Sequence, residues 1–115
     1  MPLFRRALPR IFALALAATP IPASADSFIM GAGNWTCGEA LRVANEGTES
    51  ELGQLIGWVL GFWSAMTYDH GAAFTDTIEE VGGRGVFETT LMACSEADEN
   101  APLHAISISI VRNTE

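Results

Sequence analysis

Three side chains near the middle of the sequence are of types that bind metals or transfer protons. Asp69 and His70 are adjacent, and Asp76 follows about two helical turns later. An imidazole beside carboxylates can ligate a metal ion or act as a general base. The same three residues are also typical of a polar helix end followed by a loop, and we favour that structural interpretation.

No other group of residues indicates catalysis. The sequence has no G-x-S-x-G motif, and the glycine-rich run over residues 82–85 lacks the lysine and the preceding strand of a phosphate-binding loop. His104 stands alone near the start of a predicted helix. We therefore expect a protein that is not an enzyme and that uses no cofactor or metal.

The first 25 residues have the composition of a secretory signal peptide. Arg5, Arg6 and Arg10 give a positive start, residues 11–18 are apolar but too few to span a bilayer, and residues 23–25 read Ala-Ser-Ala, a typical cleavage site. We predict cleavage after Ala25. The mature chain, residues 26–115, is then one periplasmic domain, with an N-terminal arm over residues 26–35.

The mature domain is strongly acidic. All fourteen acidic residues lie within residues 26–115 and face only Arg42, Arg84 and Arg112, so the net charge is −11 with neutral histidines. There is no lysine in the chain. This sign disfavours nucleic acids and anionic membrane surfaces as partners, and it suits either a basic protein partner or simply the solubility of the domain.

The two cysteines, Cys37 and Cys94, both lie in the exported part. An even number of cysteines in an oxidising compartment predicts a disulfide. The alternative is two free thiols or a metal-binding pair. The sequence does not favour it, because there is no CxxC spacing and no histidine near either cysteine. A bridge around residues 38–93 would stabilise this small domain by roughly 4 kcal/mol on the chain-entropy model.

Helix signals occur along most of the mature chain. Thr36 and Thr48 are each followed three residues later by a glutamate, which is the capping-box pattern. These patterns predict helices over residues 37–46 and from about residue 50 to residue 68. A single helical turn over residues 76–81, a flexible break over residues 82–85 and a helix from residue 86 to residue 94 follow.

The pattern of residues 103–111 is compatible with either a strand or a helix. Ile106, Ile108 and Ile110 alternate with serines as in a strand, but the chain contains no second strand candidate with which to pair. Leu103, Ile106 and Ile110 also fit helical spacing, and Pro102 is suited to a first helical position. We predict a helix, and thus an all-α single domain of four to five helices around a central apolar helix, stapled by one disulfide.

The central helix carries small residues at every fourth position, Gly53, Gly57, Gly61 and Ala65. Its large apolar residues fall on the other side of a helical wheel. The uncharged run, residues 52–68, is at the short limit for a bilayer, and acidic residues flank it. We predict no membrane span, and a close neighbour for the glycine side, either from the same chain or from a second copy in a homodimer. The candidate client or dimer contacts are Gly53, Gly57, Trp58, Gly61, Phe62 and Trp63.

An early cysteine, a Gly-Trp-Val-Leu-Gly-Phe run over residues 57–62 and the later Cys94 with Leu103 resemble the HdeA/HdeB family over roughly residues 36–111. The resemblance implies a small helical periplasmic acid-stress chaperone with one disulfide, dimeric at neutral pH. In acid such a protein loosens and binds unfolding clients. The chain departs from the family's usual composition in having no lysine. Its pattern is also similar to periplasmic immunity proteins, which block peptidoglycan-cutting effectors, so a binding or inhibitor protein is the alternative.

Overall fold

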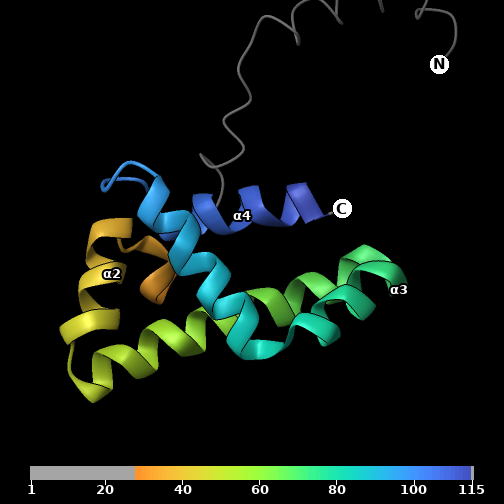
Figure 1. The fold of residues 1–115 in the computed structure, drawn as a ribbon, viewed down its shortest axis with the longest axis horizontal. Coiled ribbons are helices and arrows are strands. Elements are labelled where there is room, and N and C mark those ends of the chain that lie inside the picture. The colour runs from red at the N-terminus through yellow and green to blue at the C-terminus, as the bar shows by residue number, and fades with distance from the viewer. Residues whose placement is uncertain (1–27, 115) are drawn as a thin grey trace, which may run out of the picture.

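The computed structural model describes residues 28–114, and the regular elements in that range are all helical (Figure 1). They are a short 3-10 helix, η2 (Gly31–Asn34), and the α-helices α2 (Cys37–Glu46), α3 (Glu49–Glu96) and α4 (Leu103–Thr114). The all-α prediction is confirmed. The predicted number of helices was too high, because the described residues form three α-helices. The predicted signal peptide, residues 1–25, lies outside the described residues.

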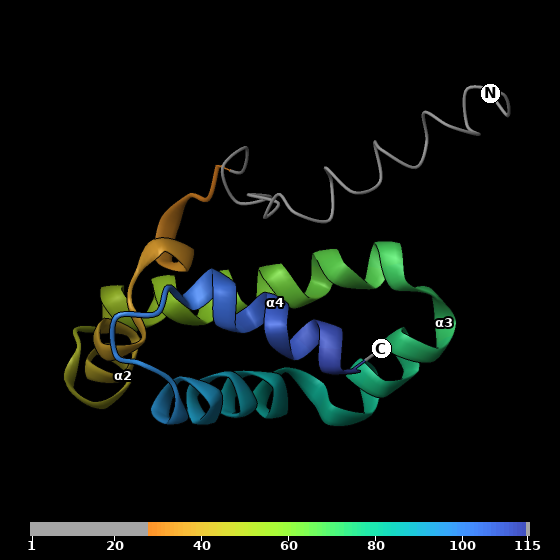
Figure 2. The same cartoon turned by 90° about the horizontal axis from the view of Figure 1, so that it is seen from above.

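Single glycines, rather than loops, divide the long helix α3. Gly71 has φ 82° and Gly82 has φ 77°, a backbone conformation that favours glycine. Helix resumes at once after each, so α3 has an outgoing run (residues 49–70), a middle run (72–81) and a returning run (83–96). Seen from above, the outgoing and returning runs form a hairpin with the middle run at its bend (Figure 2). The break predicted over residues 82–85 is therefore confined to one residue.

Both predicted capping sites lie at helix starts. Thr36 Oγ1 accepts a hydrogen bond from the Glu39 backbone N–H at 3.1 Å at the start of α2. At the start of α3, Thr48 Oγ1 accepts from the Glu51 N–H at 3.1 Å, and Glu51 Oε1 accepts from the Thr48 N–H at 3.0 Å. These bonds satisfy N–H groups that have no partner inside the helix. Consequently only two residues, Gly47 and Thr48, separate the end of α2 from the start of α3.

The Cys37–Cys94 disulfide is confirmed, with 5.1 Å between the two Cα atoms. Beside it, the backbone N–H groups of Cys37 and Gly38 donate to carbonyls of the loop after α3, at 2.8 and 2.9 Å. The Leu103 N–H donates to the Trp35 carbonyl at 2.8 Å. We call the disulfide and these three hydrogen bonds the seam. The seam ties together the start of α2, the end of α3 and the start of α4.

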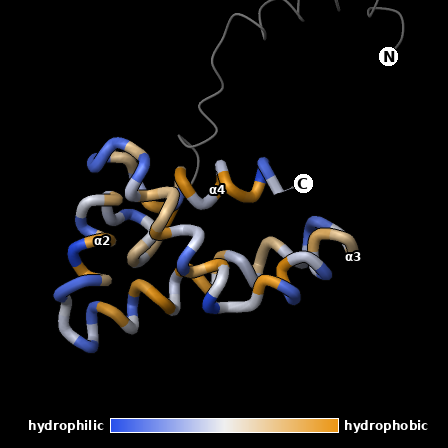
Figure 3. The backbone as a smooth tube through the Cα atoms, viewed as in Figure 1, coloured by the Kyte–Doolittle hydropathy of each residue, from blue (hydrophilic) through white to orange (hydrophobic). Residues whose placement is uncertain are grey.

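The core lies between the runs of α3 and is closed by α2 and α4. In the view from above, α4 lies between the outgoing and returning runs (Figure 2). Leu103, Ser107 and Val111 are buried at a four-residue spacing, which is that of one helix face, so the helix prediction for residues 103–111 is confirmed. Hydrophobic and hydrophilic positions recur along each helix, as expected of helices with one buried side (Figure 3).

Candidate functional site

The three candidates considered for metal binding or proton transfer, Asp69, His70 and Asp76, do not form a metal site within the described residues. At the end of the outgoing run, His70 Nδ1 lies 2.8 Å from the Met66 carbonyl oxygen, and the His70 ring centroid lies 4.8 Å from that of Phe74. Asp69 and Asp76 are exposed. Within residues 28–114, no group of three His, Cys, Asp or Glu side chains is placed to hold a metal ion. His70 contributes to helix packing there.

The outgoing run of α3 has one uncovered side made of uncharged residues, most of them small. We call this side the glycine face, and all its members are exposed: Gly53, Gln54, Gly57, Gly61, Ser64, Ala65 and Tyr68. A Cβ atom placed on Gly53, Gly57 or Gly61 would meet no atom within 4 Å. The predicted close neighbour from the same chain is therefore absent from the described residues. Whether a second copy covers this face stays a prediction.

The opposite side of the outgoing run faces the core. Leu55, Val59 and Trp63 are buried, at 0%, 0% and 3% exposure. Leu52, Ile56, Phe62 and Met66 are half-buried beside them. The two sides of the run thus differ in residue size, as the helical wheel predicts. Large apolar side chains face the core, and the glycines face outward.

The three aromatic contact candidates lie in different environments. Trp58 is covered by the arm, because a Cβ atom on Gly33 would lie only 2.3 Å from its ring. Phe62 stacks on Trp58 with 5.3 Å between ring centroids. Trp63 is buried and stacks on Phe74 of the middle run at 6.1 Å. In the folded chain, therefore, only the glycines of the predicted contact set are fully open to a partner.

The glycine face carries no charge, although acidic residues stand at both its ends. Glu51 precedes the uncharged run over residues 52–68, and Asp69 follows it. Within residues 28–114, no helix is both long enough and apolar enough to cross a bilayer. The face is therefore a neutral strip on an acidic domain.

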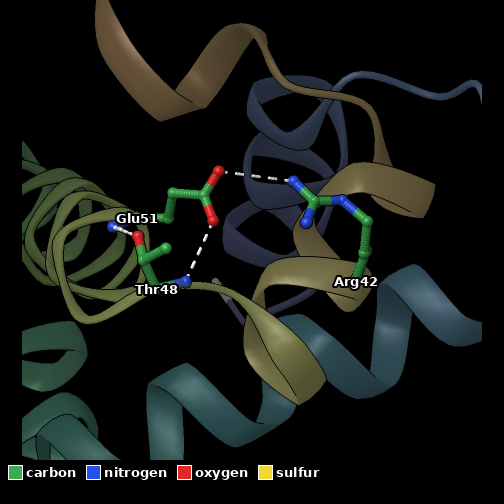
Figure 4. A network of polar contacts seen from close by, with 3 residues as sticks. All are labelled: Arg42, Thr48 and Glu51. Carbon is green, nitrogen blue, oxygen red and sulfur yellow. Dashed lines mark hydrogen bonds and ion pairs between the residues drawn. The ribbon is translucent and has the colours of Figure 1, made fainter.

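A polar junction connects α2 to the start of α3 (Figure 4). Glu51 Oε2 lies 3.5 Å from Arg42 Nη2, while its other carboxylate oxygen accepts the Thr48 N–H. The hydrogen bond from the Thr48 backbone lowers the pKa of Glu51, and the Arg42 charge lowers it further. The sequence pattern predicted the cap but not the ion pair, because the turn between the two helices brings Arg42 to Glu51.

Comparisons with protein-family models, curated proteins and solved structures find no match for this chain. The two features of the described chain that bear on function are the uncovered glycine face and the carboxylate-dependent junction at Glu51.

Two glycine substitutions test whether the face is free in the monomer. Gly57→Ala should raise the free energy of unfolding by up to roughly 1 kcal/mol, because alanine favours a helix interior and the added methyl group meets nothing. Gly82→Ala should lower it by roughly 1–2 kcal/mol, because its φ of 77° is unfavourable for alanine. Urea unfolding of the oxidised protein at pH 7 measures both. A loss of stability in Gly57→Ala would show that something already packs on this face.

Proposed function

We propose that this protein is a non-enzymatic periplasmic holding protein of the acid-stress type. In acid its helices loosen, and the apolar side of the outgoing run then binds unfolding client proteins. The observation that carries the proposal is the junction at Glu51, where one ionised carboxylate joins the Thr48 cap to Arg42 across two helices. The location rests on the predicted signal peptide.

Acid acts on this junction in a defined direction. The pKa of Glu51 in the folded chain is lowered, first by the Thr48 backbone hydrogen bond. Its ionised form therefore stabilises the fold at pH values above the usual carboxyl pKa, and this contribution is lost as the pH falls through the lowered folded value. Protonation ends the ion pair with Arg42 and weakens the acceptor of the Thr48 N–H.

The middle run provides a way for the core to open. It contributes Phe74, which stacks on Trp63 and covers the large side chains of the outgoing run. Gly71 and Gly82 connect it to its neighbours by single residues with positive φ. Because the seam holds the far end of the hairpin, the middle run can move away while the chain stays tied.

The charge of the domain also changes in acid. Once the carboxylates are protonated, below their usual pKa near 4, the net charge of residues 26–115 moves from −11 toward about +6, from three arginines, two histidines and the amino terminus. A positive net charge favours solubility of an opened chain and repulsion between copies. In the family that this chain resembles, lysines supply most of the positive charge in acid. In this chain, arginines and histidines would supply it.

The acid transition provides the test. Binding of an apolar-surface dye and protection of a client from aggregation should both rise between pH 7 and about pH 2.5. Glu51→Gln should move the dye-binding midpoint to higher pH, because this variant lacks the carboxylate contribution at every pH. Glu49→Gln is the matched control, since it removes a charge from the same helical turn without removing a hydrogen bond or ion pair of the described residues. Unchanged dye binding and no client protection in acid would contradict the proposal.

A second candidate function is that of an inhibitor that binds a secreted cell-wall hydrolase. It is favoured by the neutral glycine face, which is open in the folded state without any acid step. The surrounding charge of −11 would attract a basic enzyme at a distance, while the glycines would let its backbone approach closely.

A pull-down from periplasmic extract at neutral pH tests this second function. The wild-type protein should retain a stoichiometric partner that cuts peptidoglycan, and should inhibit it. Gly57→Arg should lose this partner, because the long side chain projects from the open face. Ser95→Arg, an exposed position at the end of α3, is the control and should keep it. Recovery of no such enzyme, or equal retention by both variants, would count against the inhibitor function.

A further inference from the structure

A cleft of about 440 Å³ opens between the outgoing run of α3 and its middle and returning runs. Pockets for small molecules have volumes of roughly 300–1,000 Å³. The apolar part of its lining comes from all three runs: Leu60 and Trp63, Ile78, and Val86. The cleft exists because the kink at Gly82 separates the middle run from the returning run, and Gly82 itself lines it.

The polar side chains that line the cleft are hydroxyl groups and one carboxylate, and Ser64 and Tyr68 can donate as well as accept. Thr67 Oγ1 donates its proton to the Ser64 carbonyl at 2.7 Å, and Thr75 Oγ1 donates to the Gly71 carbonyl at 3.0 Å. Both threonines line the cleft, and their hydroxyl oxygens keep lone pairs. Glu79 adds a carboxylate, which only accepts when ionised. The cleft thus has hydrogen-bonding side chains from two runs of α3, with its one carboxylate on the middle run.

The charged side chain that lines the cleft is negative. Among its lining residues Glu79 is the charged one, and none is Lys, Arg or His. Arg84 follows directly in sequence after the lining residue Gly83, but its guanidinium is 3.1 Å from Glu88 on the exposed side of the returning run. An anionic ligand would therefore meet the Glu79 carboxylate and no positive side chain among the lining residues.

We propose that the cleft binds a small apolar molecule carrying one primary ammonium group. The hydrocarbon part would lie against Leu60, Ile78 and Val86. An ammonium group has three donors, which match the Glu79 carboxylate and the two threonine hydroxyl oxygens. This site belongs to the folded chain at neutral pH and does not require acid loosening, and two of its lining residues, Ser64 and Tyr68, also belong to the glycine face.

Three probes with the same hydrocarbon body test the proposal: 4-phenylbutylamine, 4-phenylbutanol and 4-phenylbutyrate. Each is titrated calorimetrically into the exported, oxidised protein at pH 7 and low ionic strength. The amine should bind about tenfold more tightly than the alcohol, since hydrogen bonds to charged groups are the stronger ones, and the carboxylate should bind most weakly. Added salt should reduce the preference for the amine. Backbone amide shifts over residues 75–86 should locate the binding.

Matched variants separate this site from the general acidity of the domain. Glu79→Gln should weaken amine binding roughly fivefold or more without changing alcohol binding, whereas Glu80→Gln, exposed on the same run but outside the cleft, should change neither. Thr75→Val should weaken the amine. Thr77→Val is its control, because Thr77 also donates to a carbonyl four residues earlier but does not line the cleft.

Circular dichroism verifies that every variant is folded. Equal affinity for amine and alcohol, no binding of any probe at millimolar concentration, or an equal effect of Glu79→Gln and Glu80→Gln would overturn the proposal.

Discussion

The Cys37–Cys94 bridge and its neighbouring hydrogen bonds are the constraint on which the rest of the structure depends. The seam holds the start of α2 against the end of α3, although 57 positions separate the two cysteines in sequence. The chain between the two cysteines must therefore run away from the disulfide and turn back to it. Gly71 and Gly82 make this return with one residue each, so most of the enclosed chain can remain helical. The core is what lies between the outgoing and returning runs.

The same constraint explains why one side of the outgoing run is bare. The returning run and α4 both cover the side with the large apolar residues, and no further helix of the described chain remains for the small side. Each glycine in a helix interior costs about 1 kcal/mol relative to alanine. Gly53, Gly57 and Gly61 receive no compensating contact within the described chain. A role for this face outside the monomer, in contact with another protein or with a second copy, is consistent with that uncompensated cost.

Local chemistry made much of the fold predictable. The threonine caps located α2 and the start of α3, and the absence of a strand partner identified α4 as a helix. The sequence could not show which glycine of residues 82–85 would take positive φ, because that depends on how the runs pack. Nor could it show that the glycine side stays open, or that Arg42 reaches Glu51. Those features arise from tertiary geometry.

The central claim is that acid loosens the junction of α2 and α3 while the seam holds. Amide hydrogen exchange, expressed as protection factors at a series of pH values, measures this directly. The account predicts that protection at Glu51, and then along the outgoing run, is lost at a higher pH than protection at Cys37, Gly38 and Leu103, whose N–H groups belong to the seam. Simultaneous loss at all these amides, or full protection in strong acid, would contradict it.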